Sequence, residues 1–323
     1  MRKAIINFLK SNKDNYISGE EIAKSLDISR AAVWKHIQIL RQLGYKISSC
    51  EKRGYKLEEL PDLLLSDEIQ FDLNTKIIGK NIVHYFSIDS TNRIAKELAG
   101  NNFENGTVIV AEEQTGGKGR LNRSFFSPKS KSILFSLILR PDLLPREAPK
   151  FTLLAAVAVA SAMIKFDLKP SIKWPNDILF DGRKVVGILT EMSAEMSKIN
   201  YIVVGVGINV NINREEFPPE IREIAASLSE IKGKNISRVE FFKVLLEEFD
   251  QLYQEVIQNG FKKIFDLWRK YNITLGKKIR VIPAGEEKEF FAVAEDIDED
   301  GTLIVRTENG IEKVYAGDVS IRE

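Results

Sequence analysis

One loop of the sequence gathers residues that are suited to binding an anion. Residues 112–126 read EEQTGGKGRLNRSFF, and positions 116–123 of this stretch hold three glycines and three cations. Glycines let a backbone approach a ligand closely, and Lys or Arg beside them neutralises phosphate or carboxylate. The spacing matches neither the phosphate loop G-x-x-x-x-G-K-S/T nor the dinucleotide pattern G-x-G-x-x-G. A solvated basic loop is the alternative that these residues leave open.

Residues 87–98, SIDSTNRIAKEL, place three polar side chains between a predicted strand and a predicted helix. Ser90, Thr91 and Asn92 lie where the first helical turn begins. Hydroxyl and amide groups at this position either cap the helix or bind a ligand. Helix capping is the ordinary interpretation, and these residues alone do not decide between the two.

Residues 171–180, SIKWPNDILF, join two predicted strands through a turn with unusual contents. Asn and Asp are frequent turn formers, so Asn176 and Asp177 have an ordinary interpretation. Trp174 followed by a proline and an acid is uncommon in a plain turn. The segment is therefore a candidate for contact with a ligand.

Two later strands carry one cation and two glycines. In residues 182–192, GRKVVGILTEM, Lys184 enters an apolar strand directly after an Asp-Gly hairpin turn, where a lysine is ordinarily solvated. In residues 203–211, VVGVGINVN, Gly205 and Gly207 interrupt a strand, which usually indicates close approach of another group to the backbone.

The first sixty residues have the pattern of a DNA-binding module. Ser18 and Ser29 each suit the N-cap of a helix, and Gly44 suits the end of the second helix. Two helices across a short turn form a helix-turn-helix, whose second helix enters the major groove. Residues 45–57 alternate as a hairpin with a basic tip, similar to the wing of winged-helix domains. The residues expected to contact DNA are Ser29, Arg30, Ala31, Trp34, Lys35, Gln38, Lys52 and Arg53. A small interaction domain with solvated charges is the alternative.

Composition and charge narrow the class of protein. The chain is 44% hydrophobic and 29% charged, as in an ordinary globular protein. Residues 1–60 hold twelve Lys or Arg and seven Asp or Glu, which gives them a net charge of +5. Since the whole chain has a net charge of +1, the remaining residues have a net charge of −4. A single cysteine excludes a disulfide framework and fits a reducing cytoplasm. With one cysteine and two histidines, the sequence predicts no protein metal site. The longest apolar run, residues 151–164, is too short to span a bilayer and predicts a buried helix.

Behind the basic module, strand and helix patterns follow one another without a regular repeat. Strands are predicted at 82–87, 107–112, 132–139, 170–174, 185–192 and 201–209, and helices at 91–99, 147–166, 237–258 and 261–270. This mixture predicts an α+β domain with a mixed sheet. The last fifty residues are short strands broken by Gly and Asp, which suit a small barrel. The expected domains are residues 1–60, 65–272 and 275–323.

The five stretches together resemble the biotin–protein ligases. The segments DSTN, EQTGGKGR, KWPND, GRKVVGIL and GVGIN, at residues 89–92, 113–120, 173–177, 182–189 and 205–209, follow the order and spacing of that family. The module in front is similar to that of the bifunctional kind, the bacterial biotin operon repressors. The resemblance covers essentially the whole chain. It implies a winged helix-turn-helix, a mixed-sheet ligase domain and a small SH3-like β-barrel.

The resemblance implies a two-step reaction. Biotin and ATP form biotinyl-5′-AMP and pyrophosphate, and the biotinyl group then passes to a lysine of a biotin carboxyl carrier protein. The first step brings a carboxylate to the α-phosphorus of ATP, so fixed cations and N–H groups must offset the charge of two anions. Mg²⁺ is expected to arrive with the nucleotide phosphates.

The resemblance also implies roles for particular residues. Lys184, Arg120, Lys118 and Asp177 are expected to be catalytic, with Asp177 orienting Lys184 or the carrier amine. The residues expected to bind biotin and biotinyl-5′-AMP are Ser90, Thr91, Asn92, Gln114, Gly117, Lys118, Gly119, Arg120, Trp174, Asn176, Lys184, Gly187, Gly207 and Asn209. Trp174 is expected to pack against the valeryl chain of biotin.

The bifunctional kind further implies a repressor of biotin synthesis genes. The adenylate is then the corepressor, and its binding favours a homodimer on two-fold operator DNA. Such a protein works in the cytoplasm and not at a membrane.

The loop departs from the family pattern. Family loops often read G-R-G-R-R-G-R, whereas residues 117–123 read GKGRLNR. Lys118 keeps the charge but lacks the two-pronged guanidinium of Arg. Leu121 and Asn122 replace a cation and a glycine, so retention of the adenylate is expected to differ. Two alternatives stay open, a ligand-sensing repressor without ligase activity and a lipoate or octanoate ligase of related fold.

Overall fold

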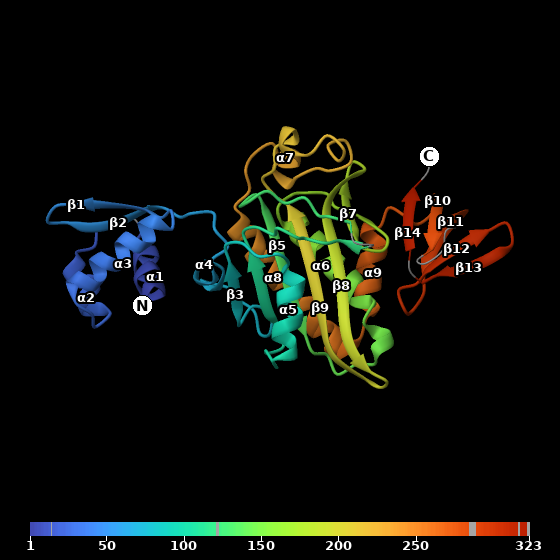
Figure 1. Ribbon diagram of the computed structural model, residues 1–323, viewed down its shortest axis with the longest axis horizontal. Helices are drawn as coiled ribbons and strands as arrows, with labels where there is room; N and C mark the ends of the chain where they lie inside the picture. Colours follow the sequence, from blue (N-terminus) through green and yellow to red (C-terminus); the bar gives the residue numbers. More distant parts are fainter. Residues whose placement is uncertain (14, 121–122, 284–288, 316, 322–323) are drawn as a thin grey trace. The chain divides into compact units, whose positions relative to one another are not determined.

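The computed structural model describes residues 1–323 except 14, 121–122, 284–288, 316 and 322–323. This described part divides into two compact units, residues 1–63 and residues 64–323. Figure 1 labels the elements of both units. Unit 1 contains helices α1 (Arg2–Ser11), α2 (Gly19–Ser25) and α3 (Arg30–Gln42), followed by strands β1 (Lys46–Cys50) and β2 (Gly54–Glu59).

Both helix caps predicted for unit 1 are present. The Ser18 side chain accepts the N–H of Glu21, and the Ser29 side chain accepts the N–H of Ala32. Each cap satisfies one of the free N–H groups of a first helical turn, which stabilises the helix by about 1 kcal/mol. Gly44 follows α3 with a φ of +92°, the left-handed conformation that ends a helix at low cost.

The predicted hairpin of unit 1 is also present, with β1 and β2 antiparallel. Val33, Ile37 and Leu40 of α3 are buried, as the helical pattern predicts. At the hairpin, Gly54 has a φ of +99°, and a Cβ there would lie 2.0 Å from the carbonyl oxygen of Ile17. Only glycine fits this contact, so the position of the hairpin against the helices depends on Gly54.

Unit 2 is built on a seven-stranded mixed sheet with strand order β3-β4-β5-β9-β8-β7-β6. The strands are β3 (Ile82–Tyr85), β4 (Thr107–Ala111), β5 (Ser132–Leu139), β6 (Ser171–Lys173), β7 (Asp177–Phe180), β8 (Arg183–Glu195) and β9 (Lys198–Asn209). β3 and β4 are parallel, and the other neighbours are antiparallel. The prediction of an α+β fold with a mixed sheet is therefore confirmed.

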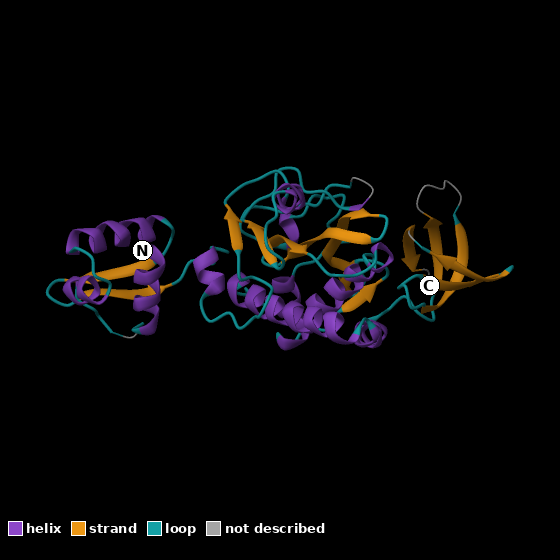
Figure 2. Ribbon diagram, turned by 90° about the horizontal axis from the view of Figure 1, so that it is seen from below, coloured by secondary structure: helices purple, strands orange, loops and turns teal. Residues whose placement is uncertain are grey.

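Helices cover both faces of the sheet in unit 2. They are α4 (Ser66–Gln70), α5 (Thr91–Gly100), α6 (Lys150–Lys165), α7 (Leu228–Lys232), α8 (Arg238–Asn259) and α9 (Lys262–Tyr271). Figure 2 shows the layer of long helices beneath the strands. β5 is buried along its whole length because Phe135 and Leu137 face the large core while Ile138 faces α5. The strands and helices expected between residues 82 and 270 are all present, with ends shifted by no more than three residues.

The apolar run in the middle of the chain is a core helix. Within the described residues, the segment Pro145–Lys165 alone is long and apolar enough to span a bilayer, and 72% of its apolar window is buried inside the protein. α6 packs against α8 and α9 as well as against the sheet. Its apolar residues on all sides are explained by this burial, as the sequence predicted.

The C-terminal strands form a five-stranded antiparallel sheet with order β13-β12-β11-β10-β14. They are β10 (Lys278–Pro283), β11 (Phe290–Ile297), β12 (Leu303–Thr307), β13 (Gly310–Val314) and β14 (Gly317–Ile321). In the described part of the chain, no pairing joins β13 to β14. The sheet is therefore open at these two strands, and the expected closed barrel is not confirmed.

A buried ion pair fixes the base of the glycine-rich loop. Glu112 and Arg238 are both fully buried, and Arg238 Nη2 lies 2.9 Å from Glu112 Oε2. The other oxygen of Glu112 accepts the N–H of Leu64 at 2.6 Å, and Arg238 Nη1 donates to the carbonyl of Ser132 at 3.0 Å. Burial raises the pKa of Glu112, but His84, Arg238 and the Leu64 N–H outweigh it and lower the pKa to about 2. The carboxylate is therefore ionised at neutral pH.

We expect Glu112→Gln to destabilise the protein by about 3–5 kcal/mol at pH 7, because it leaves the Arg238 charge buried without its partner. The ordinary pKa of the glutamate is 4.5. Stabilisation by the ionised carboxylate is thus present above that pH and is lost as the pH falls toward 2. Urea unfolding between pH 7 and pH 3 measures both effects. Glu195→Gln, at an exposed site, is the control, and equal midpoints for the two variants would contradict the assignment.

Candidate functional site

A cavity of about 560 Å³ lies over strands β8 and β9 of unit 2. Thirteen residues that the sequence predicted for the site line it: Ser90, Thr91, Asn92, Gln114, Lys118, Gly119, Arg120, Asn176, Asp177, Lys184, Gly187, Gly207 and Asn209. They come from all five of the quoted stretches, which are separated by up to about a hundred residues of sequence. The fold thus brings the chemically capable segments to one place.

Two predicted residues do not line the cavity. Trp174 is 3% exposed and belongs to the large core, where its indole N–H donates to the carbonyl of Gly301 at 3.3 Å. The structure therefore does not bring Trp174 to the cavity wall, and its packing against a bound acyl chain stays a prediction. Gly117 instead supports the loop, since its carbonyl accepts the N–H of Phe125 at 3.1 Å.

Two glycines form the floor of the cavity. Gly187 of β8 and Gly207 of β9 are paired in register, and the ring of Phe125 lies over them. A Cβ at Gly207 would lie 2.7 Å from the Phe125 ring, and one at Gly187 would lie 3.4 Å from it. The two glycines therefore let the Phe125 ring lie directly on the sheet at the floor of the cavity. Sequence reasoning gave Phe125 no role, although the aromatic pair after the basic loop was a visible signal.

Lys184 and Asp177 form an ion pair at the wall of the cavity. Lys184 Nζ lies 2.6 Å from Asp177 Oδ1, and both side chains are partly exposed. The pair is brought together by the antiparallel hairpin β7–β8, whose turn residues Asp181 and Gly182 have positive φ angles. The backbone of Lys184 is held from the other side, because its N–H donates to the carbonyl of Ile224 at 2.7 Å. A cation with a fixed position faces the cavity here.

Arg120 connects the glycine-rich loop to two other segments. Its Nη1 donates to Asn176 Oδ1 at 3.1 Å, and its Nη2 donates to the carbonyl of Gly317 in β14 at 2.9 Å. The Asn176 amide in turn donates to the carbonyl of Ile188 at 2.7 Å. Two positions at which the loop departs from the family pattern lie outside the described residues, namely Leu121 and Asn122.

The opposite end of the cavity is polar. Ser90 is the N-cap residue of α5, but its side chain makes no capping hydrogen bond, so the ordinary interpretation of this hydroxyl does not hold. Thr91 donates through both its N–H and its hydroxyl to Gln114 Oε1, at 2.7 and 2.9 Å. Ser136 of β5, fully buried, contacts the Thr91 hydroxyl at 2.8 Å. This end of the cavity is therefore lined by two hydroxyl-bearing residues, Ser90 and Thr91.

Sequence reasoning missed one whole wall of the cavity. Phe217, Ile221, Ile224 and Ala225, from the segment after β9, line it with Phe126. Phe217, Ile212 and Ala225 form a small apolar cluster against which Phe126 and Ile221 pack. The segment has no period of 2 or 3.6 residues, so its sequence held no signal beyond scattered apolar residues. Ser320 of β14 also lines the cavity.

The residues expected to contact DNA lie on exposed parts of unit 1. Arg30, Ala31, Trp34 and Lys35 are exposed on one side of α3, and Trp34 is 59% exposed. Gln38 is half-buried, and the Ser29 side chain is used as the cap of α3. Lys52 and Arg53 are exposed at the tip of the hairpin, where the Arg53 guanidinium lies 4.6 Å from the centre of the Tyr16 ring.

Known families match three successive parts of the chain. A model described as HTH domain matches residues 2–56, the biotin/lipoate A/B protein ligase family matches residues 85–209, and the biotin protein ligase C-terminal domain matches residues 274–322. The bifunctional ligase/repressor BirA of Bacillus subtilis is 39% identical over 322 residues, 99% of this chain and 98% of that protein. The chain belongs to the bifunctional biotin ligase/repressor family.

Other members of the biotin ligase family agree with this placement. The bifunctional ligase/repressor BirA of Escherichia coli is 30% identical over 306 residues, which cover 94% of this chain and 92% of that protein. The biotin protein ligase of Aquifex aeolicus, in complex with biotin and ATP, matches in structure with a TM-score of 0.64 and 30% identity. That match covers 75% of this chain and 99% of the Aquifex chain.

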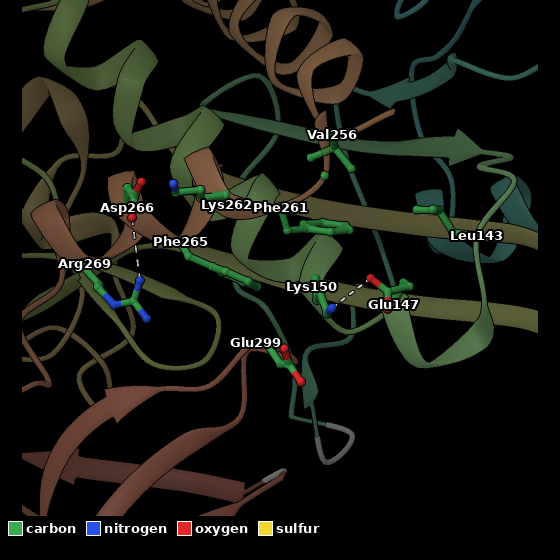
Figure 3. Close-up of a pocket in the computed structure, with 11 residues that line it drawn as sticks. Leu143, Glu147, Lys150, Val256, Phe261, Lys262, Phe265, Asp266, Arg269 and Glu299 are labelled. Atoms are coloured by element: carbon green, nitrogen blue, oxygen red, sulfur yellow. Dashed lines mark hydrogen bonds and ion pairs between the residues drawn. The ribbon is translucent and has the colours of Figure 1, made fainter. Parts of the chain in front are cut away.

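A second cavity, of about 420 Å³, lies apart from every residue predicted for the ligase site. Figure 3 shows it between the start of α6, the junction of α8 and α9, and Glu299. Phe261 and Phe265 form its apolar side, and Lys150, 6% exposed, contacts Glu147 at 2.8 Å. Arg269 and Asp266, which also line this cavity, form a second ion pair at 3.8 Å.

We expect Gly207→Ala to weaken biotin binding by about tenfold, because the added Cβ collides with Phe125 and fills the floor of the cavity. Overpacking of this kind costs about 1–3 kcal/mol. Isothermal titration with biotin measures the change. Gly100→Ala is the control, since a Cβ at Gly100 meets nothing within 4 Å. Unchanged affinity in the Gly207 variant would show that ligand does not lie on these glycines.

Proposed function

We propose that the 560 Å³ cavity of unit 2 is the site where this ligase joins biotin to ATP and releases the biotinyl group to a carrier lysine. The observation that carries the proposal is the convergence of five separated stretches on a single cavity that has a polar end, a glycine floor and fixed cations. The polar end suits the ureido ring of biotin, and the floor suits its apolar chain.

The geometry supports the first step as follows. The biotin carboxylate attacks the α-phosphorus of ATP, a new bond forms between carboxylate oxygen and phosphorus, and the bond to the β-phosphate oxygen breaks to release pyrophosphate. Lys184 supplies a cation where the two anions meet, and Asp177, 2.6 Å away, keeps it in position. Lys118 and Arg120 lie on the loop that faces the phosphates.

The second step transfers the biotinyl group to an amine. The carrier lysine attacks the acyl carbon of biotinyl-5′-AMP, an amide bond forms, and AMP leaves with the oxygen of the broken anhydride. The amine must lose a proton, and Asp177 is the carboxylate of the cavity that is placed to orient it. Closure of the loop over the mixed anhydride protects it from water until the carrier arrives.

The apolar wall supports a place for the nucleotide base. Phe217, Ile221, Ile224 and Ala225 offer the flat, apolar surroundings that a purine ring requires. Mg²⁺ is proposed to arrive bound to the ATP phosphates, which need only one or two protein ligands. In the described residues, no cluster of three or more His, Cys, Asp or Glu is placed to hold a metal ion.

Unit 1 is proposed to bind operator DNA through α3 and the basic hairpin tip. A helix with exposed Arg30 and Lys35 suits the major groove, and Lys52 and Arg53 suit adjacent phosphates. Biotinyl-5′-AMP is the proposed corepressor, and its binding favours a homodimer in the cytoplasm. The proposed domains are residues 1–60, 65–272 and 275–323, and the bulge in β11 supports an SH3-like barrel in the last.

We expect the protein, given ATP, Mg²⁺ and biotin, to label a biotin carboxyl carrier domain, with detection by streptavidin blot and mass spectrometry. Lys184→Ala should slow adenylate formation by about 100-fold or more, because a cation at the developing charge is lost. Lys80→Ala, at an exposed site, is the matched control. Labelling with lipoate in place of biotin would assign the site to the related lipoate ligases.

The repressor half is tested with the same protein in a gel shift on operator DNA. Biotin with ATP should strengthen the shift, and Lys35→Ala should weaken it and reduce the slope of affinity against salt by about one. Biotin transfer without any shift on DNA would remove the repressor role and leave the ligase role intact.

A further inference from the structure

A chain of hydrogen bonds runs from the protein surface to the polar end of the cavity. Glu191 of β8 contacts Lys96 Nζ at 2.8 Å and accepts a hydrogen bond from Asn92 Nδ2 at 2.8 Å. Asn92 Oδ1 lies 2.6 Å from the hydroxyl of Ser136, and that hydroxyl lies 2.8 Å from the hydroxyl of Thr91. Thr91 lines the cavity, so the chain ends on the ligand site.

The orientation of the Asn92 amide has one solution. Its Nδ2 faces Glu191 Oε2 and, at 3.3 Å, the carbonyl of Leu189, and both of these oxygens are acceptors only. Asn92 Oδ1 must therefore face Ser136, and the single hydroxyl proton of Ser136 must point to it. Gly205 makes room for this arrangement, because a Cβ there would lie 2.0 Å from Asn92 Oδ1. The polar groups of Asn92 are thus used within the protein, so this side chain shapes the cavity rather than bonding the ligand.

The proton of Thr91 is fixed as a consequence. Ser136 has no second proton to give, so it can only accept from Thr91, and the other neighbour of the Thr91 hydroxyl, Gln114 Oε1 at 2.9 Å, also accepts. Whichever of the two receives it, the Thr91 proton remains inside the protein. The oxygen of Thr91 therefore presents a lone pair to the cavity and acts as a hydrogen-bond acceptor toward a ligand.

We propose that Glu191 is a positioning residue that sets this polarity. Its carboxylate determines the orientation of Asn92, Asn92 takes the proton of Ser136, and Thr91 is left to accept a hydrogen bond from an N–H of the ligand. Lys96 contacts the other carboxylate oxygen of Glu191 and holds the carboxylate directed at Asn92. Without the carboxylate, the hydroxyl groups of Ser136 and Thr91 can exchange their donor and acceptor roles. The site then no longer distinguishes a ligand N–H from a ligand oxygen at this position. The inference rests on the proposed binding of the biotin ureido ring at this end.

The test compares biotin with an analogue in which oxygen replaces both ureido N–H groups, giving a cyclic carbonate. Steady-state adenylation yields KM and kcat for each ligand. Glu191→Ala should raise KM for biotin about three- to tenfold, the effect of one hydrogen bond, with kcat changed less than twofold and KM for ATP unchanged. KM for the carbonate should stay the same or fall. The ratio of the two KM values, which measures the preference for biotin, should therefore shrink by about three- to tenfold.

Two further variants make the result specific. Glu191→Gln keeps an acceptor oxygen for Asn92 Nδ2 and should stay within about twofold of the wild-type preference, whereas a loss equal to that of Glu191→Ala would overturn the polarity mechanism. Glu195→Ala, which removes an exposed carboxylate from the same strand, controls for net charge and folding. An unchanged preference in Glu191→Ala would also overturn the inference. A wild-type protein that adenylates no biotin would instead remove the proposed function on which the inference rests.

Discussion

Close approach of an aromatic ring to the backbone of two paired strands is the constraint on which this cavity depends. Gly187 and Gly207 are neighbours in register, so they form one patch of the sheet that has no side chains of its own. The other parts of the site surround that patch. Phe125 lies over it, Lys184 lies at its edge, and Gly205 admits the side chain of Asn92 beside it. A side chain at either paired position would push the Phe125 ring away from the floor of the cavity.

Burial of charge provides the rigidity that such an exposed patch needs. Arg238 and Glu112 lie fully inside the protein and contact both ends of the loop that crosses the cavity, at residues 112 and 132. Ion pairs of this kind contribute little net stability, but their directional bonds define one arrangement of the chain. The first backbone N–H of unit 2, that of Leu64, belongs to the same set of bonds. The ion pair therefore fixes the two ends of this loop.

The sequence predicted the residues that line the cavity better than it predicted the contacts that keep those residues in position. The Asp-Gly turn predicted the hairpin that carries Asp177 and Lys184, and their ion pair agrees with one of the two roles that the family resemblance implied for Asp177. The burial of Trp174 in the core was not predicted, because a turn sequence does not show which side of the turn faces the core. Glu191, Ser136 and Phe217 received no role, since their importance arises from contacts with residues far away in the chain. Periodicity and turn chemistry are local signals, and they carry no information on such contacts.

The hydrogen bond between Arg120 and the carbonyl of Gly317 makes the C-terminal sheet part of the ligase site. β14 lies at the edge of that sheet, with β10 as its one neighbour among the described strands. Its outer edge thus offers main-chain groups to a second polypeptide, and pairing there would displace or steady the Gly317 carbonyl. A protein that docks on this strand would consequently alter the position of the Arg120 guanidinium while remaining outside the cavity, which couples binding of a macromolecule to the groups that line the cavity.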